Sequence, residues 1–479
     1  MRDFYERNPE YEERLMFLEE GGASFTYGDF EGFYEENAKM LRPGRLAFLF
    51  CENRIGAAAF YLTCLRRHVV PLLLERHLDA SLRGNLIRTY DPGYLILPRE
   101  MAGEFEGEET RPLEGGGETG YVVLERVMSA PIDLHPDLAL LLTTSGSTGS
   151  PKLVRQSRKN IQSNAESIVS YLEISDSERP ITSLPMQYTF GLSIINSHVL
   201  AGAAVLLTRR SLFEREFWDF FKNAGATSIS GVPYTYEMLK RLRFLEMDLP
   251  SLRTMTQAGG KLAPALHREF AEFAKRTGRK FVVMYGQTEA TARMGYLPAD
   301  RALEKCGSMG IAIPGGTFRL MEDEKTEITE PGVVGELVYE GDNVTMGYAE
   351  CRDDLKKGDE RGGILFTGDM AKRDSDGFYY ITGRKKRFLK MFGKRVNMDE
   401  IEQMFKAEYP GIGVACTGRD DQMRIFAAGK DEAFCEAAAQ WISEKTGVHI
   451  HGIRVLPIDE IPKNESGKTL YKDLPKDGE

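Results

Sequence analysis

Apolar and polar residues follow two alternating patterns between residues 202 and 289. Short strand-like runs lie at 202–210, 226–233, 253–260 and 280–289. The segments between them have the spacing of amphipathic helices, and in the last of these Leu266, Phe270 and Phe273 share one face. Strand-like and helix-like segments that alternate in this way predict parallel βα units, and therefore an α/β fold.

The residues at the ends of these runs are unusual for a protein core. Ser230-Gly231, Gly259-Gly260 and Gln287-Thr288-Glu289 stand at the ends of three of the runs. In parallel sheets, ligands bind beyond the carboxyl ends of the strands. The pattern therefore predicts a binding site at this edge of the sheet.

The pattern changes on either side of this region. After about residue 310, short β-like runs are separated by turns, which indicates a β-rich subdomain. From about residue 387 we expect a small α+β unit, in which Asn397 caps a first helix and two strands, a helix at 431–446 and a third strand follow. The acidic, glycine-rich segment 101–120 is expected to be a surface loop.

Length, charge and cysteine content narrow the class of protein. The 479 residues fit two or three domains, and a net charge of 62 − 72 = −10 argues against a general nucleic-acid binder. No apolar run has the length of a membrane span or the position of a signal peptide, so we expect a cytoplasmic protein. Six scattered cysteines and seven histidines lack metal-ligand spacing, which favours reduced thiols over a structural zinc site.

The stretch TTSGSTGSPK, at 143–152, is made of hydroxyl and glycine residues that end in a proline and Lys152, and it follows an apolar run. Glycines let backbone N–H groups approach an anion, hydroxyls add donors and the lysine adds positive charge, so a polyphosphate fits best. A flexible surface turn is the alternative. A Walker A loop is excluded, because Gly467-Lys468-Thr469 has Pro462 where that motif needs its first glycine.

This stretch resembles the signature of the adenylate-forming superfamily, which contains acyl-CoA ligases, acyl-AMP ligases, luciferases and the adenylation domains of nonribosomal peptide synthetases. Further segments resemble motifs of that family, in the family's order: LPMQYTFG (184–191), QAGGKL (257–262), YGQTE (285–289), GELVYEG (335–341), FTGD (366–369), GFYYITGRKKRFLKMFGKRVNMDEIE (377–402) and PKNESGKTLYK (462–472). The first 140 residues match only loosely, through FTYGDF.

The resemblance implies two domains of unequal size. The large N-terminal adenylation domain (1–385) would hold mostly parallel sheets flanked by helices, together with a β-rich subdomain. The small C-terminal α+β domain (387–479) would be mobile and would carry the catalytic lysine. The hinge between them would lie near Lys386, where relatives more often have aspartate.

An ATP site is implied as well. Its residues would be Thr144, Ser145, Gly146, Ser147, Thr148, Gly149, Lys152, Gly259, Gly260, Tyr285, Gly286, Gln287, Asp369 and Arg384. The loop residues would hold the β- and γ-phosphates, the Tyr285 ring would pack on adenine, and Asp369 would accept hydrogen bonds from the ribose. Thr288 would bond the α-phosphate, and Glu289 would hold Mg²⁺, for which a carboxylate oxygen is a suitable ligand.

The last part of the chain would supply charge to both steps of the reaction. Adenylation brings a carboxylate to an α-phosphate, and Lys468 would stabilise that meeting of two anions when the small domain closes. After the domain rotates, Lys390, Gly393 and Arg395 would face the thiol, which suits the phosphates of CoA or an acidic carrier protein. On composition alone, these basic residues would be a solvated surface.

One region narrows the choice of acid. Tyr188, Phe190 and Gly191 would line the acyl pocket, with Val232 and Gly260 across the site. Gly191 stands where amino-acid-activating relatives carry an aspartate that pairs with the substrate ammonium. Because a buried ammonium without a counter-charge is unfavourable, α-amino acids are disfavoured and an apolar or weakly polar acid is expected.

Three functions are therefore considered. The first is an ATP- and Mg²⁺-dependent enzyme that joins a small carboxylic acid to CoA through acyl-AMP. The second forms the same acyl-AMP but delivers the acyl group to the phosphopantetheine of a carrier protein. The third, a non-catalytic nucleotide-binding scaffold, is disfavoured because Lys468, Glu289, Asp369 and the phosphate loop are all present.

Overall fold

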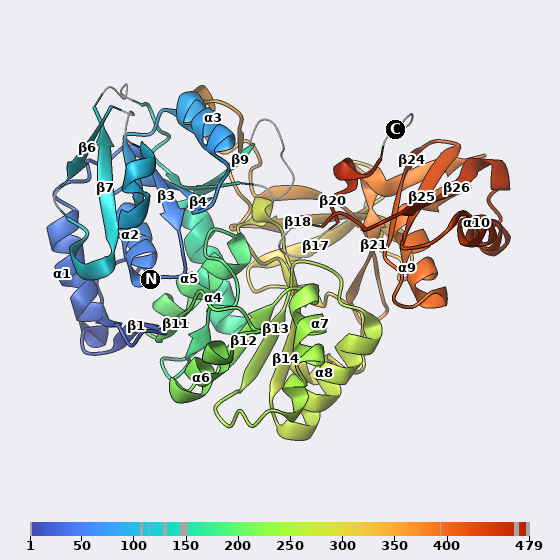
Figure 1. The fold of residues 1–479 in the computed structure, drawn as a ribbon, viewed down its shortest axis with the longest axis horizontal. Helices are drawn as coiled ribbons and strands as arrows, with labels where there is room; N and C mark the ends of the chain where they lie inside the picture. The colour runs from blue at the N-terminus through green and yellow to red at the C-terminus, as the bar shows by residue number, and fades with distance from the viewer. Residues whose placement is uncertain are drawn as a thin grey trace. The chain divides into compact units, whose positions relative to one another are not determined.

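A computed structural model describes residues 2–105, 109–113, 115–127, 132–143, 152–392, 394–463 and 469–475. Backbone contacts divide the chain into two compact units (Figure 1). The first comprises Met1–Thr317 and Glu340–Leu365, and the second comprises Phe318–Tyr339 and Phe366–Glu479. The hinge expected near Lys386 concerns a movement, so it stays a prediction.

A nine-stranded sheet in the first unit contains the predicted βα units. Its order is β16-β15-β14-β13-β12-β10-β11-β1-β2, and neighbouring strands from β14 to β1 are parallel. The strands are β1 (Leu15–Glu19), β2 (Ser24–Thr26), β10 (Pro180–Ile181), β11 (Val205–Leu207), β12 (Ser228–Gly231), β13 (Thr254–Gln257), β14 (Lys280–Tyr285), β15 (Gly295–Leu297) and β16 (Ile311–Ala312). The helices between the predicted strands are α6 (Arg215–Asn223), α7 (Pro233–Arg241) and α8 (Pro264–Thr277). The predicted alternation and its parallel sheet are confirmed.

Helix α8 shows why the sequence pattern was informative. Leu266, Phe270 and Phe273 are all buried on one face, as their spacing predicted. Pro264 occupies the first turn, where its missing N–H is not needed, and Gly278 ends the helix at φ +69°. Burial of each of these side chains contributes about 1.5–3 kcal/mol, so this face fixes α8 on the sheet.

An eight-stranded sheet forms the rest of the first unit, in the order β19-β9-β8-β4-β3-β5-β7-β6. Its strands are β3 (Leu46–Cys51), β4 (Val70–Glu75), β5 (Tyr94–Pro98), β6 (Thr110–Leu113), β7 (Tyr121–Arg126), β8 (Leu138–Thr143), β9 (Leu153–Ser157) and β19 (Gly347–Ala349). The helices α1 (Tyr27–Asn37), α2 (Ile55–Arg66), α3 (Ala80–Tyr90), α4 (Arg158–Leu172) and α5 (Thr189–Leu200) complete the unit. Buried residues of both sheets and of α2, α4 and α5 form one hydrophobic core.

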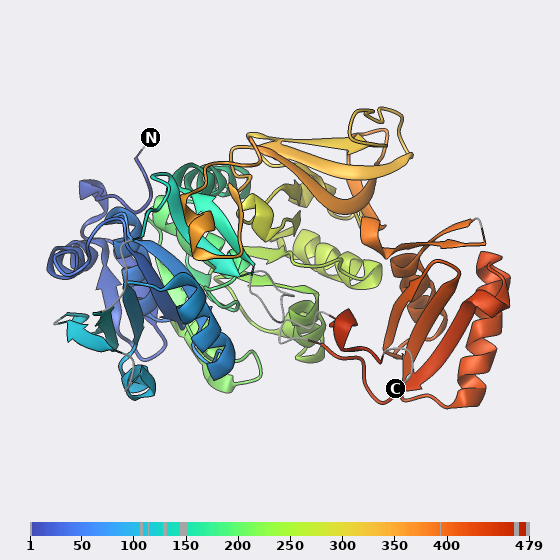
Figure 2. The same cartoon turned by 90° about the horizontal axis from the view of Figure 1, so that it is seen from above.

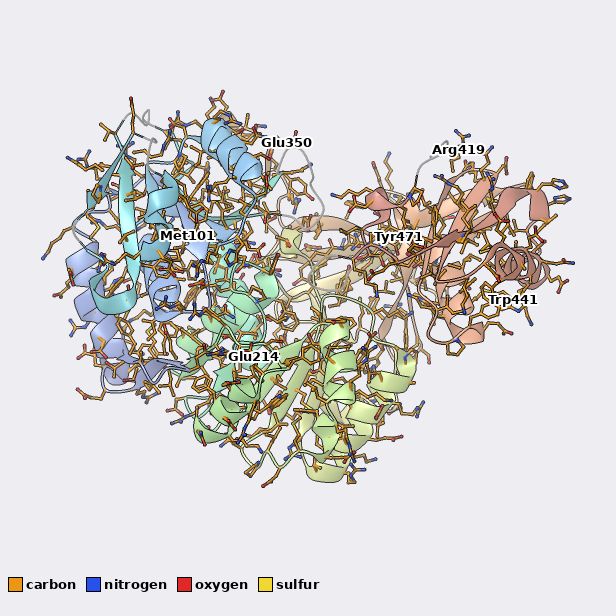
Figure 3. The ribbon with its side chains drawn as sticks, in the orientation of Figure 1. Met101, Glu214, Glu350, Arg419, Trp441 and Tyr471 are labelled. Atoms are coloured by element: carbon orange, nitrogen blue, oxygen red, sulfur yellow. The ribbon has the colours of Figure 1, made fainter. Side chains whose placement is uncertain are left out.

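The surface-loop prediction for 101–120 is wrong in part. A 3₁₀ helix, Arg99–Phe105, buries Met101, which Figure 3 labels, and Phe105 against the eight-stranded sheet. Strand β6 then pairs with β7 at the sheet edge. The prediction followed the acidic composition of the whole segment and overlooked the two apolar residues, Met101 and Phe105, that pack on the sheet.

The second unit contains most of a four-stranded sheet and the predicted small α+β unit. The four strands are β17 (Gly316–Met321), β18 (Val334–Gly341), β20 (Ile364–Arg373) and β21 (Tyr379–Arg384), in that order. The hairpin β22 (Phe388–Met391) and β23 (Lys394–Asn397) leads into α9 (Met398–Glu408), β24 (Val414–Arg419), β25 (Gln422–Ala428), α10 (Glu432–Thr446) and β26 (Ile453–Ile458). Strands β24, β25 and β26 form one sheet against which α10 packs (Figure 2). Asn397 caps α9 by accepting a hydrogen bond from the Asp399 N–H at 3.0 Å, as expected.

Within the described ranges, no helix is both long and apolar enough to cross a membrane. All six cysteines fall inside these ranges and are free thiols.

Candidate active site

Three loops leave the nine-stranded sheet at one edge. In the parallel register, Gly231 of β12 is level with Gln257 of β13, which is level with Val283 of β14. The polar residues that follow β13 and β14 therefore emerge beside the end of β12 (Figure 1). The sequence prediction that these strand ends meet is confirmed.

The loop after β13 lies close against the start of α7. Gly259 adopts φ +81°, and a Cβ atom there would lie 3.0 Å from Val232 Cγ1. A Cβ atom on Gly260 would lie 3.0 Å from Pro233 Cγ. Gln257 fixes this loop, because its Nε2 donates to Gly260 O at 2.9 Å. The result is a rigid backbone ledge without side chains, against which a flat group can lie.

The loop after β14 is equally constrained. Gly286 faces Ala292, whose carbonyl oxygen would lie 1.7 Å from a Cβ atom, so only glycine fits. The Tyr285 hydroxyl accepts a hydrogen bond from Gln287 Nε2 at 3.2 Å. A 3₁₀ helix, Thr288–Ala290, then carries the predicted α-phosphate and magnesium residues.

Glu289 is held by residues that sequence reasoning missed. The Tyr348 hydroxyl donates a hydrogen bond to Glu289 Oε1 at 2.8 Å. The backbone oxygen of Glu289 accepts from Thr345 N at 3.0 Å, from Thr345 Oγ1 at 2.9 Å and from Arg361 Nη1 at 2.9 Å. Burial and the neighbouring carboxylate raise the pKa of Tyr348 to about 12, so the phenol keeps its proton at neutral pH. The site is therefore built from segments far apart in the sequence.

Two cations flank the Tyr348 ring. Lys152 Nζ lies 3.9 Å from the ring centroid, and the Arg361 guanidinium carbon lies 4.7 Å from it. Lys152 Nζ also lies 3.3 Å from Glu350 Oε1, and Figure 3 labels Glu350. Because both partners in this pair are well exposed, the pair is weak and can open to another anion.

The predicted phosphate loop is framed by paired strands. Thr143, the last residue of β8, is in register with Leu153 of β9. The loop residues Thr144, Ser145, Gly146, Ser147, Thr148 and Gly149 lie outside the described residues, and Lys152 is the first described residue after them.

A magnesium ion fits the chemistry of this site. Tyr348 donates its hydrogen bond to Oε1 of Glu289, so the other carboxylate oxygen, Oε2, is the candidate metal ligand. Among the described residues, no group of three or more His, Cys, Asp or Glu could hold a metal by itself. One carboxylate combined with substrate phosphates is the usual environment of Mg²⁺ in proteins, and Glu289 can supply that carboxylate.

The predicted ribose ligand, Asp369, pairs in the second unit with Arg384, the predicted second contact to the nucleotide. Asp369 of β20 is in register with Arg384 of β21, and Arg384 Nε lies 2.6 Å from Asp369 Oδ1. Asp369 is buried, whereas the Arg384 side chain is 54% exposed. A buried carboxylate needs such a partner, and an exposed guanidinium can shift without large loss.

The predicted acyl-pocket residues come together in part. Phe190 and Ile194, both in α5, belong to one apolar cluster against which Val232 packs. Tyr188, at the start of α5, is 38% exposed. At Gly191 a Cβ atom would lie 2.2 Å from Pro185 O, so no side chain fits there. This backbone contact is sufficient by itself to explain why no aspartate stands at Gly191, and the link to substrate choice stays a prediction.

Arg293 is a pocket residue that sequence reasoning also missed. It follows the YGQTE segment by four residues and is 4% exposed. Its guanidinium carbon lies 3.8 Å from the centroid of the Phe190 ring. The sequence signal that could have identified it is its position, because it is a single arginine only four residues after the YGQTE motif.

The segment that carries the catalytic lysine is only partly described. Lys468 and Gly393 lie outside the described residues, and nothing is described of the Lys386 and Arg395 side chains. On either side of 464–468, Lys463 and Thr469 form a β-bridge. Lys390 is exposed on β22.

Tyr471 anchors the chain just after this segment. Figure 3 labels this tyrosine. Its hydroxyl donates to Glu402 Oε2 at 3.0 Å, and the Arg387 guanidinium carbon lies 3.9 Å from its ring centroid. The chain that follows Lys468 is therefore fixed to the small α+β unit.

Comparison with known proteins assigns the family. The model of the AMP-binding enzyme family matches residues 4–349. Indoleacetate–CoA ligase of Aromatoleum aromaticum is 31% identical over 420 residues, which cover 83% of this chain and 81% of that protein. Oxalate–CoA ligase of Arabidopsis thaliana is 31% identical over 419 residues, which cover 82% and 80%. The chain belongs to the AMP-binding enzyme family.

The fold agrees with this assignment. The o-succinylbenzoate–CoA synthetase of Bacillus subtilis, solved with ATP and a magnesium ion, matches with a TM-score of 0.76 at 21% identity and covers 96% of each chain. The protein is an AMP-forming acid–CoA ligase that uses ATP, Mg²⁺ and CoA.

Proposed function

We propose that this chain activates a small carboxylic acid at the edge formed by β12, β13 and β14, and then passes the acyl group to the sulfur of CoA. In the first step a carboxylate oxygen attacks the α-phosphorus of ATP, and pyrophosphate leaves. In the second step the thiol sulfur attacks the acyl carbon, the thiol proton is lost to solvent, and AMP leaves. The observation that carries this proposal is the orientation of Glu289 by Tyr348 and Arg361 at the strand edge.

The nucleotide would bind along the loops after β13 and β14. The backbone at Gly259 and Gly260 leaves room for the flat adenine, and the Tyr285 ring would cover its other face. The Thr288 hydroxyl would donate to the α-phosphate, where charge develops during attack. Bound at Glu289 Oε2, Mg²⁺ would neutralise phosphate charge.

Lys152 would exchange one partner for another when ATP binds. Its exposed ion pair with Glu350 is weak in water, whereas a phosphate chain offers several negative charges. The Tyr348 ring would hold the ammonium group close to the phosphates throughout the exchange. The residues 144–149 would add backbone and hydroxyl donors.

The small C-terminal domain, 387–479, would take part in both steps. In adenylation, Lys468 would neutralise charge where the carboxylate attacks the α-phosphate, while Asp369 would bind the ribose and Arg384 would add a second contact to the nucleotide. Rotation about Lys386 would then bring Lys390, Gly393 and Arg395 to the thiol. The residues on either side of this hinge are ion-paired: Lys385 pairs with Glu336, and Arg387 pairs with Asp399 and Glu402. Because both neighbours are held in this way, the change of backbone angle would occur at Lys386.

The acid and the cellular location are proposals of a different kind. The relatives named above act on acids as unlike as indoleacetate and oxalate, so the family alone does not fix the acid. The apolar cluster around Phe190 favours a small acid without an amino group. ATP and CoA are abundant in the cytoplasm, which is where we expect the protein to act.

One experiment tests the proposed function. Purified protein is given ATP, Mg²⁺, labelled pyrophosphate and a panel of small carboxylic acids, and label exchange into ATP is measured. We expect exchange that depends on one class of acid, with thioester formed when free CoA is added. If none of the acids supports label exchange, a non-catalytic scaffold is favoured. If the acyl group is transferred only to a phosphopantetheinylated carrier protein, CoA is not the acceptor.

A further inference from the structure

A small cavity lies behind the apolar cluster that contains Phe190. Its described lining residues come from α4 and the segment after it, from α5, β12 and β13, and from the segment after β14: Ile168, Leu172, Ile174, Glu178, Ser193, Ile194, Ser197, His198, Ser228, Ser230, Thr254, Thr256 and Arg293. Its volume of about 30 Å³ has room for roughly two water molecules. Most of its polar lining consists of hydroxyl groups. Those of Ser193 and Ser197 donate to backbone oxygens, whereas Ser230 and Thr256 share one hydrogen bond, so one hydroxyl of that pair can donate to an anion.

Arg293 is a buried cation without a counter-ion. It is 4% exposed, and in the described part of the chain no carboxylate forms an ion pair with it. Its Nε–H is buried and has no hydrogen-bond partner. Burial also lowers the pKa of its guanidinium from the ordinary value. A charge held in this state is unfavourable unless something else completes its environment.

The position of Arg293 is fixed rather than adventitious. Its backbone oxygen accepts hydrogen bonds from Asn164 Nδ2 at 2.9 Å and from Asn343 Nδ2 at 2.8 Å, and both asparagines are buried. The guanidinium packs on the Phe190 ring and interacts with the Tyr171 hydroxyl. The guanidinium is thus held inside the protein, whereas a flexible arginine side chain usually extends its charged end to solvent.

The other ionisable residues of the lining do not neutralise it. Glu178 bonds the Thr227 hydroxyl and lies 3.5 Å from Arg253. Burial lowers the pKa of His198 to about 4, so this imidazole is neutral at physiological pH. Arg293 is therefore the one positive charge among the described lining residues.

The cavity adjoins the predicted acyl site. Phe190 contacts Arg293 and also belongs to the apolar cluster with Val232. Two lining residues also lie close in sequence to the strand edge: Ser230 is one residue before Gly231, and Thr256 is three residues before Gly259. Their hydroxyl oxygens are 2.8 Å apart. An acid whose reacting carboxylate lies at the strand edge would direct its far end into this cavity.

We propose that the acid substrate carries a second carboxylate, which binds Arg293 in this cavity. The proposal rests on the proposed function and replaces the expectation of an apolar or weakly polar acid. The second carboxylate would pair with the guanidinium, accept a hydrogen bond from the Ser230 and Thr256 hydroxyl pair and displace the water that fits there. A monocarboxylic acid of equal length would leave Arg293 buried and unpaired, so the site rejects it.

The test compares matched acids in the pyrophosphate exchange assay. Malonate, succinate and glutarate are compared with propionate, butyrate and pentanoate. We expect kcat/KM for the preferred dicarboxylate to exceed that of its matched monocarboxylate by at least about 100-fold. Faster exchange with the monocarboxylates would overturn the inference of a second carboxylate but not the proposed function. If no acid of the wider panel supports exchange, the proposed function itself is contradicted.

The variant Arg293→Met separates binding from structure. Methionine fills a similar volume without charge. We therefore expect the ratio of kcat/KM for the dicarboxylate to kcat/KM for the matched monocarboxylate to fall below about 10, while activity with monocarboxylates is kept or rises. Thermal stability should not fall, because a buried unpaired cation is removed. The exposed Arg215→Met is the matched control and should keep the wild-type preference.

Two outcomes with this variant would overturn the proposal. One is an equal loss of activity with every acid together with lower thermal stability, since that would make Arg293 a structural residue. The other is an unchanged preference. Should Arg293→Met fail to fold, Arg293→Lys and the wild-type panel decide, because a retained positive charge must retain the preference for dicarboxylates.

Discussion

The Tyr348 hydroxyl donates a hydrogen bond to Glu289 Oε1 at 2.8 Å, although the two residues are 59 positions apart. Tyr348 also carries Lys152 and Arg361 over its ring. One phenol thus orients the proposed metal ligand and positions two cations around it.

Tyr348→Phe should therefore impair adenylation while it leaves the ring contacts in place. A hydrogen bond to a charged group contributes about 1.5–3 kcal/mol, so we expect kcat/KM for pyrophosphate exchange to fall about 10- to 100-fold, with a raised requirement for Mg²⁺. Tyr380→Phe, which loses a comparable bond to Asp374, is the control and should leave exchange unchanged. If Tyr348→Phe keeps full activity at low Mg²⁺, the proposed role of this pair is wrong.

Gly191→Ala should destabilise the protein, because its Cβ would meet Pro185 O at 2.2 Å. Relief of such a clash requires backbone movement, and we expect a loss of about 1–3 kcal/mol in the free energy of unfolding. Gly32→Ala is the matched control, since α1 leaves open space around it and alanine favours a helix. Denaturant unfolding measures both, and equal stability of the two variants would contradict the contact.

Lys468→Ala should abolish acyl-AMP formation from ATP but leave the reaction of supplied acyl-AMP with CoA mostly intact. The reason is that only adenylation brings two anions together. Lys472→Ala, a neighbouring exposed lysine, should affect neither step. Rates of both half-reactions are measured separately, and an equal loss in the two would contradict the assigned role.

Lys386→Pro should give the opposite result, with adenylation spared and thioester formation slowed. Lys386 lies in the short 3₁₀ helix Lys385–Arg387, and proline would restrict the backbone angle at the proposed hinge. Lys386→Ala keeps that freedom and should behave like the wild type. A loss of adenylation as large as the loss of thioester formation would show that the hinge lies elsewhere.

The sequence predicted what depends on local pattern. The face of α8, the parallel strands of the nine-stranded sheet and the Asn397 cap each follow from residues close together in the chain. It did not predict Tyr348 or Arg361, because their role depends on pairing of β19 with β9, which brings distant residues beside Glu289.

The acyl pocket shows the same division. The apolar residues of LPMQYTFG were recognised from their motif, and Phe190 does lie in a buried cluster. Arg293 was not recognised, because only the packed structure reveals that its charge is buried and lacks an ion-pair partner among the described residues. An arginine in sequence is most often exposed, so its burial had to be observed.

The most direct test of the account is to identify the nucleotide product when protein, ATP, Mg²⁺ and the accepted acid are mixed without a thiol. Mass spectrometry should detect acyl-AMP and pyrophosphate, with AMP and the acyl thioester appearing once CoA is added. ADP and inorganic phosphate in their place, or no cleavage of ATP, would contradict activation through an acyl-adenylate.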